Sequence, residues 1–207
     1  RALKELAEIF RSVGLKTKSN EKALEGLSKV EEVVLNRKAI SPEYVQDALQ
    51  TKWEIYLVME QLTQAIDTCR LLIQLFPNST LVDQAMVKIG QANLEKGQYQ
   101  AAITIFSSIL RLPKSDQAPY AAFMVGEAYE KMAESANNKS YLTNAMNAFQ
   151  ACAEKYPNSL FAGQAIEKVA NFYLKMQDYQ RAADLMQNVA QDFPDLDNMD
   201  AMLLKWA

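Results

Sequence analysis

A short pattern that occurs four times limits what this chain can fold into more than any other feature does. Each copy has an alanine, an apolar residue four positions later, and a proline that directly follows an aromatic residue or a leucine. The interval from alanine to proline is 11 residues in the second copy and 12 in the others, at Ala65 and Pro77, Ala102 and Pro113, Ala145 and Pro157, and Ala182 and Pro194. Self-similarity at this scale predicts stacked repeats, which form extended binding surfaces rather than enclosed pockets.

Between these repeated alanines and prolines the apolar residues recur with the period of an α-helix. No segment has the alternation of apolar and polar residues that is typical of a strand. The predicted helices cover residues 2–13, 21–39, 42–60, 62–75, 81–96, 99–110, 118–133, 141–155, 160–176 and 179–191, and another begins near residue 197. The polar residues 16–20 are expected to separate the first two helices. In the second helix the residues expected to face inward are Leu24, Leu27, Val30 and Val34, with Leu35 a further candidate.

The pattern also predicts how the chain is organised. Residues 1–40 form an N-terminal helix pair that is a degenerate or capping repeat, and residues 197–207 begin a further helix. Residues 41–196 form four repeats, at about 42–79, 80–115, 118–159 and 160–196. The wider spacing of prolines in the third repeat indicates an insertion of about seven residues around 133–140. This insertion should lengthen the loop between the two helices or the helix ends beside it.

Small residues in the pattern have a clear physical role, because two antiparallel helices pack closely only where one side chain is small. The first helix of repeats two to four offers Gly90, Gly126 and Ala170 for this purpose. The repeated alanines do the same on the second helix, and large residues such as Phe149 fill the space between one pair and the next. Proline then prevents the second helix from continuing. Gly97 is expected to close the first helix of the second repeat in a left-handed conformation.

These residues resemble the tetratricopeptide repeat (TPR) family over about residues 44–194. The second repeat matches best, with Gly90 and Gly97 followed by Tyr99, Ala102 and Phe106. Trp53 departs from the family pattern, because it stands where the other repeats have glycine or alanine. The resemblance implies an all-α, right-handed superhelical solenoid of antiparallel helix pairs whose function is protein–protein interaction.

The turns between repeats carry a narrower resemblance. An aromatic-Pro-Asn-Ser sequence occurs at residues 76–79 and again at 156–159, and its serine is placed to cap the next helix. Ser41, directly before Pro42, is expected to cap in the same way. This turn sequence resembles those of the bacterial cell-envelope branch of the family. That branch includes the lipoproteins of outer-membrane protein assembly and the periplasmic proteins of the Tol–Pal system. The resemblance therefore implies a place in the periplasm or cell envelope.

Composition argues against several other classes of function. The 207 residues have a net charge of −3 without a basic stripe, which disfavours nucleic acid as a partner. No apolar run is long enough to insert into a membrane. The chain has no histidine, so it lacks the commonest general base and metal ligand, and we expect no catalytic, cofactor or metal site. The two cysteines, Cys69 and Cys152, are expected to be buried thiols that are not joined in a disulfide.

The resemblance implies that the first helix of each pair lines a concave face where a partner segment binds. The outward residues of these helices that we select as candidate contacts are Glu54, Val87, Gln91, Tyr120, Phe123, Glu127 and Asn171. For Tyr120 and Phe123 the alternative is that they only pack between repeats. Gln50 and Glu54 stand where the family's clamp for acidic chaperone tails has a lysine and an asparagine, so that function is disfavoured.

The sequence therefore predicts a non-catalytic interaction module that binds a protein or peptide. A second hypothesis is a structural spacer or self-association scaffold in a bacterial envelope protein, with a homo-oligomer as its product. A third is an enzyme whose catalytic domain lies outside this segment. The chain begins at Arg1 without a methionine, and we interpret it as a part of a longer or processed protein.

Overall fold

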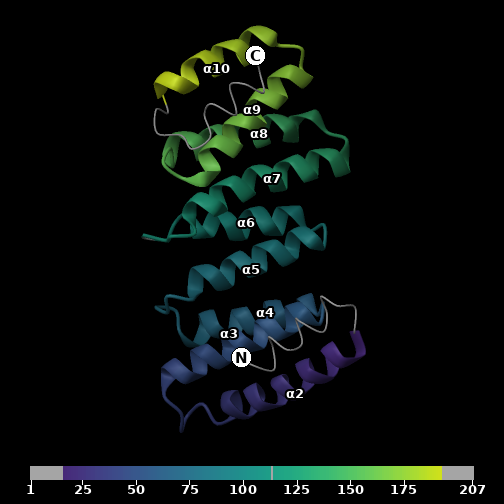
Figure 1. Ribbon diagram of the computed structural model, residues 1–207, viewed down its shortest axis with the longest axis vertical. Helices are drawn as coiled ribbons and strands as arrows, with labels where there is room; N and C mark the ends of the chain where they lie inside the picture. The colour runs from purple at the N-terminus through teal and green to yellow at the C-terminus, as the bar shows by residue number, and fades with distance from the viewer. Residues whose placement is uncertain (1–15, 113, 193–207) are drawn as a thin grey trace. The chain divides into compact units, whose positions relative to one another are not determined.

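The computed structural model describes residues 16–112 and 114–192, and within these ranges the regular elements are all α-helices (Figure 1). The helices are α2 (Lys16–Leu35), α3 (Pro42–Val58), α4 (Leu62–Leu75), α5 (Val82–Glu95), α6 (Tyr99–Ile109), α7 (Ala118–Ala136), α8 (Lys139–Lys155), α9 (Leu160–Lys175) and α10 (Tyr179–Asp192). From α3 onward the expected bounds are correct to within three residues at each end. The expected helices at residues 2–13 and beyond 197 lie outside the described residues, as do Pro113 and Pro194.

Contacts between Cα atoms divide the chain into two compact units, residues 1–92 and 93–207, with the boundary inside α5. In the first unit α3 packs against α2 and α4. In the second unit each helix from α6 to α10 packs against the next one along the chain, and α7 also contacts α9. Packing between sequence neighbours is what stacked helix pairs produce.

The same backbone turn closes every helix pair from α3 to α10. One residue in each turn takes a positive φ, and these residues are Glu60, Gly97, Asn137 and Gln177. The next residue in each turn donates its N–H to a carbonyl five positions earlier, as from Gln98 to Asn93 at 2.8 Å and from Asp178 to Tyr173 at 2.9 Å. This is the Schellman closure that glycine favours. The prediction for Gly97 is confirmed, and three other residue types accept the same geometry.

The insertion in the third repeat lengthens both helices by about one turn and leaves the connection between them short. In the third repeat the residue with positive φ, Asn137, follows Gly126 by 11 positions. In the second repeat the equivalent residue, Gly97, follows Gly90 by 7. Ala145 then follows Asn137 by 8 positions, whereas Ala102 follows Gly97 by 5. Four inserted residues therefore extend α7 and three extend α8. Because a turn of α-helix has 3.6 residues, both helices keep their facing sides.

The core is built from the small and large residues that the repeats predict. All four repeated alanines are buried, and so are Phe106 and Phe149. Gly126 lies directly behind the ring of Phe149, where a side chain on α7 would have no room. In the second unit the buried cluster continues through Val169 and Phe172 of α9. Close approach at small residues thus sets the spacing of the helix pairs.

Of the serine caps expected at residues 41, 79 and 159, only that of Ser79 forms, and Ser115 in the related turn before α7 accepts the same kind of bond from the N–H of Gln117 at 3.2 Å. In the turn before α5, the hydroxyl of Ser79 accepts a hydrogen bond from the N–H of Leu81 at 3.1 Å and donates one to Gln46. Ser41 precedes α3 with an extended backbone, but its side chain makes no capping bond. Ser159 precedes α9 in the same way, and its buried hydroxyl has no hydrogen-bond partner within the described structure. Pro42 alone marks the start of α3.

The structure corrects the sequence prediction for α2. Residues 16–20, the first that the structure describes, are helical rather than a linker, because Lys, Ser and Asn carry only small penalties inside a helix. The helix ends at Leu35, and residues 36–40 form turns and bends. Leu24 is 55% exposed and Leu35 is also exposed, whereas Ala23 is buried against Ile55 of α3. Leu27 and Val30 pack against this contact and Val34 is buried, so the prediction of the inward face is confirmed for these three residues and wrong for Leu24 and Leu35.

Candidate functional site

In the second unit, aromatic side chains from α6, α7, α8 and α9 form one continuous cluster. The ring of Tyr120 lies 6.3 Å from Phe106 and 5.4 Å from Phe161, measured between centroids. Phe123 lies 5.2 Å from Phe149 and 5.7 Å from Phe161. Only 8% of Phe123 is exposed, so most of its surface is used in packing between repeats. Tyr120 is half-buried and keeps part of its surface open.

Beside this cluster, Lys168 of α9 joins two carboxylates of α7. Its Nζ lies 2.6 Å from an oxygen of Glu127 and 2.6 Å from an oxygen of Glu130, and it sits 5.7 Å from the centroid of the Phe149 ring. Burial alone would lower the pKa of Lys168, but its hydrogen bonds to the two carboxylates and their charges outweigh that effect and raise it. The lysine stays protonated at neutral pH, and the three groups together carry one negative charge.

Four of the predicted contact residues belong to the second unit, and α7 and α9 bring them onto neighbouring helices. Tyr120, Phe123 and Glu127 are on α7, and Asn171 is on α9, one turn beyond Lys168. Tyr120, Glu127 and Asn171 are all half-buried. Together with Lys168 they form the surface that we call the α7–α9 face. This face combines an aromatic ring, an amide and a charged cluster, which are groups suited to holding a peptide.

The other three predicted residues belong to the first unit and are described separately. Glu54 of α3 accepts a hydrogen bond from the side-chain amide of Gln50 at 3.2 Å. Gln91 of α5 accepts one from Lys88 at 3.3 Å. Val87 is buried, with 6% of its surface exposed, so little of its side chain is open to a partner.

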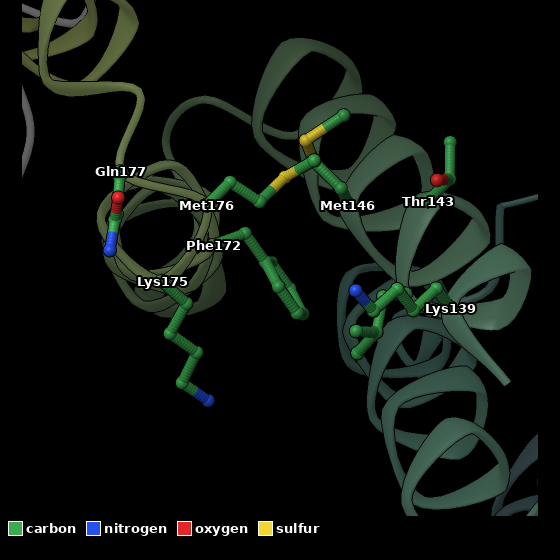
Figure 2. A pocket seen from close by; sticks show the side chains of 8 residues that line it. Lys139, Thr143, Met146, Phe172, Lys175, Met176 and Gln177 are labelled. Carbon is green, nitrogen blue, oxygen red and sulfur yellow. The ribbon is translucent and has the colours of Figure 1, made fainter. Parts of the chain in front are cut away.

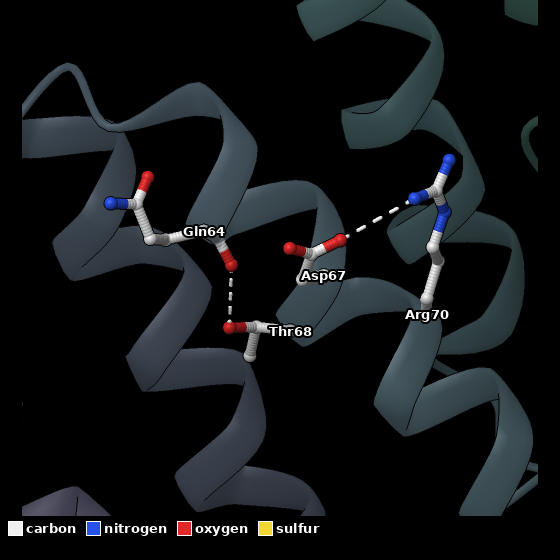
Figure 3. Close-up of polar contacts among 4 residues, drawn as sticks. All are labelled: Gln64, Asp67, Thr68 and Arg70. Atoms are coloured by element: carbon white, nitrogen blue, oxygen red, sulfur yellow. Dashed lines mark hydrogen bonds and ion pairs between the residues drawn. The ribbon is translucent and has the colours of Figure 1, made fainter.

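The first unit also has a shallow polar hollow of about 210 Å³ between α3 and α4. Lys52 lies on one side of it, 3.3 Å from Glu31 and 5.9 Å from the centroid of the Tyr56 ring. Burial, and then the charge of Glu31, raise the pKa of Tyr56. On the α4 side, the hydroxyl of Thr68 donates to the carbonyl of Gln64 at 2.8 Å (Figure 3). The same view includes a 3.4 Å ion pair between Arg70 and Asp67. Lys52, Asp67 and Thr68, which line the hollow, are thus already engaged by neighbouring groups.

A deeper groove of about 450 Å³ lies between α8 and the C-terminal end of α9 (Figure 2). Its lining residues are Lys139, Leu142, Thr143, Met146, Phe172, Lys175, Met176 and Gln177. Phe172 and Met176 extend from α9 toward α8, where Met146 faces them. Sequence reasoning missed this groove, because its walls come from two helices whose relative placement only the fold reveals. The available signal was the pair of methionines outside the repeat pattern.

The described residues offer no arrangement suited to metal binding or thiol chemistry. They hold no group of three or more His, Cys, Asp or Glu placed to bind a metal ion. Cys69 and Cys152 are buried and not joined in a disulfide, as predicted. Burial raises the pKa of Cys69 to about 12, against an opposing effect of the Lys88 charge, and raises that of Cys152 to about 11. Both thiols are therefore protonated at neutral pH. Within the same residues, none of the helices has the length and apolar character of a membrane span.

Comparison with known protein families gives a match over most of the chain. A family model described as an outer membrane lipoprotein, YfiO, matches residues 45–206. The outer membrane protein assembly factor BamD of Helicobacter pylori is 28% identical over 107 residues. This alignment covers 51% of the present chain and 49% of BamD, so the chain spans about half the length of that relative.

Solved structures share this arrangement of helices, and some of them are described as TPR proteins. MamA from Desulfovibrio magneticus, from residue 41 to its end, has a TM-score of 0.56 at 16% identity, covering 92% of this chain and 97% of its own. YrrB, described as a TPR protein with an unusual peptide-binding site, has a TM-score of 0.54 at 16% identity, covering 99% of this chain and 91% of its own. At such low identity these similarities establish the fold alone, and they confirm the all-α, TPR-like solenoid predicted from the repeats.

Proposed function

The chain belongs to the YfiO family of outer membrane lipoproteins, and from this premise we propose that it is a non-catalytic module that binds other proteins during outer-membrane assembly. The family membership agrees with the resemblance that the two aromatic-Pro-Asn-Ser turns carry, and it assigns the chain to the bacterial cell envelope. BamD of Helicobacter pylori, the relative that aligns with half of the chain, is an outer membrane protein assembly factor.

The observation that most supports a binding role is the composition of the α7–α9 face. Its residues are half-buried, so a partner segment can touch them without any rearrangement of the helices. Tyr120 offers an aromatic ring and Asn171 an amide, while the Glu127–Lys168–Glu130 cluster offers carboxylate oxygens with one negative charge left uncompensated. Because such side chains recognise both the main chain and the polar groups of a peptide, an extended or helical segment of a partner is the ligand that fits.

The seven residues selected from the sequence have different places in this proposal. Tyr120, Glu127 and Asn171 are direct contacts in the second unit, and Glu54 and Gln91 are direct contacts in the first. Val87 and Phe123 are buried, so we assign them the role of holding the neighbouring contact residues in position.

Photocrosslinking in the native envelope tests the proposal. A photoreactive phenylalanine analogue replaces Tyr120 or Asn171, and the same analogue at exposed Glu154 of α8 is the matched control. We expect crosslinks to a component of outer-membrane assembly from positions 120 and 171 and none from position 154. Crosslinks that form only at position 154 would place the binding surface on another side of the molecule and refute the proposal for this face.

A structural spacer or self-association scaffold is the alternative function. The observation in its favour is a set of large apolar side chains that are well exposed, among them Tyr44, Leu160 and Tyr179. Such residues bury apolar area when two copies associate. The oligomeric state of the chain in solution separates this alternative from the interaction module.

A further inference from the structure

The groove between α8 and α9 has a positive rim around an apolar floor. Leu142, Met146 and Phe172 form the floor, while Lys139 and Lys175 stand at the rim. None of the residues that line the groove is acidic. Neither lysine forms an ion pair with a carboxylate of the described residues, and the Nζ of Lys175 lies over the Phe172 ring, 6.0 Å from its centroid. Two positive charges thus stand beside apolar surface without a partner charge in the described fold.

Helix stability does not explain the position of Lys139. It is the first residue of α8, on the turn that the insertion adds, where the partial positive charge of the helix N-terminus repels a cation. Nor does the core explain Met176, which is 68% exposed at the end of α9, close in sequence to exposed Tyr179. A lysine in an unfavourable position and an exposed methionine at the same groove are features that a ligand would account for.

We propose that this groove binds an acidic segment of a partner protein, with apolar side chains on the floor and flanking carboxylates at Lys139 and Lys175. The charge of the rim selects negative groups, and at about 450 Å³ the groove lies within the usual range of ligand sites. Met146 and Met176 suit such a segment, because unbranched thioether side chains adapt to apolar groups of different shapes.

A peptide fits these observations better than a membrane surface does. Phe172 and Leu142 are buried or half-buried at the floor of a hollow. A flat layer of headgroups would reach the lysines but would leave this floor uncovered. A segment with a protruding side chain reaches both the lysines and the floor.

Fluorescence polarisation with defined synthetic peptides tests the proposal on the whole chain. The probe is a fluorescein-labelled peptide, Glu-Glu-Leu-Phe-Glu-Glu, and its counterparts replace every Glu with Lys or replace Leu-Phe with Gly-Gly. We expect only the first peptide to bind, with an affinity that falls as salt concentration rises. Lys139→Glu should weaken binding by about three- to tenfold, and Met176→Gln should weaken it as well.

The variants are chosen so that unfolding cannot imitate loss of binding. Lys139→Glu replaces a cation with an anion at a helix N-terminus, so its thermal stability should equal or exceed that of the parent chain. Lys155→Glu, at the opposite end of the same helix, is the matched control and should leave peptide binding unchanged. If Lys139→Glu and Met176→Gln both bind the acidic peptide as the parent does, the groove is not the site.

Two other results would also overturn the proposal. One is sedimentation of the chain with phosphatidylglycerol vesicles, lost in Lys139→Glu, together with no binding of the acidic peptide, which would mean that the groove serves a membrane. The other is a dimer in sedimentation velocity that Lys139→Glu dissociates, which would mean that a second copy fills it. Tyr120→Ala should not affect peptide binding, so failure of the groove and failure of the α7–α9 face are distinguishable.

Discussion

The ring of Phe149 on α8 lies so close to the backbone of Gly126 on α7 that a Cβ atom at residue 126 would come within 2.6 Å of the ring. The nearest atoms would be Cε1, Cδ1 and Cζ, at 2.6, 2.7 and 2.8 Å. Real Cβ atoms do not approach a ring so closely, and Phe149 is fully buried, so it has no free space to move into. The third repeat therefore requires glycine at this position.

Gly126→Ala should destabilise the protein by about 1–2 kcal/mol. Overpacking of a core costs about 1–3 kcal/mol. Alanine has the better helix propensity, which offsets up to about 1 kcal/mol of this cost. Equilibrium urea unfolding measures the difference. In the presence of Phe149→Leu the same substitution should cost less, because the smaller side chain leaves room for the methyl group. A variant with parental stability would mean that the two helices separate easily at this point.

Gln177→Gly should stabilise the protein by about 0.5–1 kcal/mol. Gln177 has a φ of 60°, a left-handed conformation that glycine adopts without the steric cost of a Cβ atom. Asn137→Gly should change the stability less, because asparagine tolerates this conformation. The measured quantity is the midpoint of urea unfolding. Lys131→Gly is the control, since glycine at this exposed interior position of α7 should cost about 1 kcal/mol.

Lys168→Met should lower stability by about 1–2 kcal/mol at pH 7, because it leaves Glu127 and Glu130 close together without their shared cation. The pKa of Lys168 is raised in the folded state above its ordinary value of 10.5. The contribution of its charge is therefore complete below about pH 10 and is lost as pH rises through the folded pKa. Urea unfolding of both chains between pH 7 and 11 should give a constant difference that shrinks only at the alkaline end. A difference that already shrinks near pH 8 would contradict the raised pKa.

The two thiols should not react with Ellman's reagent at pH 8 while the chain is folded. Burial raises the pKa of Cys69 to about 12 and that of Cys152 to about 11, so the reactive thiolate is scarce and enclosed. Both should react at once in concentrated urea. Lys155→Cys, at an exposed position, is the positive control and should react immediately. A rapid reaction of the folded parent chain with the reagent would show that one of the two helices carrying these thiols opens readily.

Sedimentation velocity should detect a monomer if the chain is an interaction module. The scaffold alternative predicts a dimer or larger species whose proportion increases with protein concentration. Tyr44→Ser and Tyr179→Ser each remove an exposed apolar side chain, one from each unit, and should each weaken such an association if they contribute to it. A stable oligomer that neither substitution affects would require a different contact surface.

The sequence was most informative where a residue type has one physical role. The repeated alanines, Gly97 and the residues before each proline predicted where the helices of residues 42–192 begin and end, because close packing and chain reversal exclude most other residues. In α2 the prediction was right for Leu27, Val30 and Val34 and wrong for Leu24, because Ala23 is the residue that fits against Ile55 of α3.

The binding surfaces were harder to predict, since exposure depends on how neighbouring helices cover a residue. Helical periodicity placed Phe123 and Tyr120 on the same side of α7. Phe161 packs against both rings, but Phe149 packs against Phe123, which is 8% exposed, whereas Tyr120 stays half-buried. The ion pairs of Lys168 join residues about 40 positions apart, and nothing in the local sequence of either helix indicates them. The groove beside Lys139 depends on helix ends that the sequence located only approximately.

The division of the seven inserted residues into four on α7 and three on α8 has a consequence for the surface of the third repeat. Adding about one turn to both α7 and α8 moves the turn between them outward by about 5 Å along the helix axes. The core contacts of the original helix pair are preserved. New side chains, Lys139 among them, therefore arrive on a surface that no earlier residue occupied, without a compensating change elsewhere. An insertion of this size gives a repeat a new recognition feature and leaves its interior packing unchanged, whereas two residues per arm would rotate the tip by about half a turn.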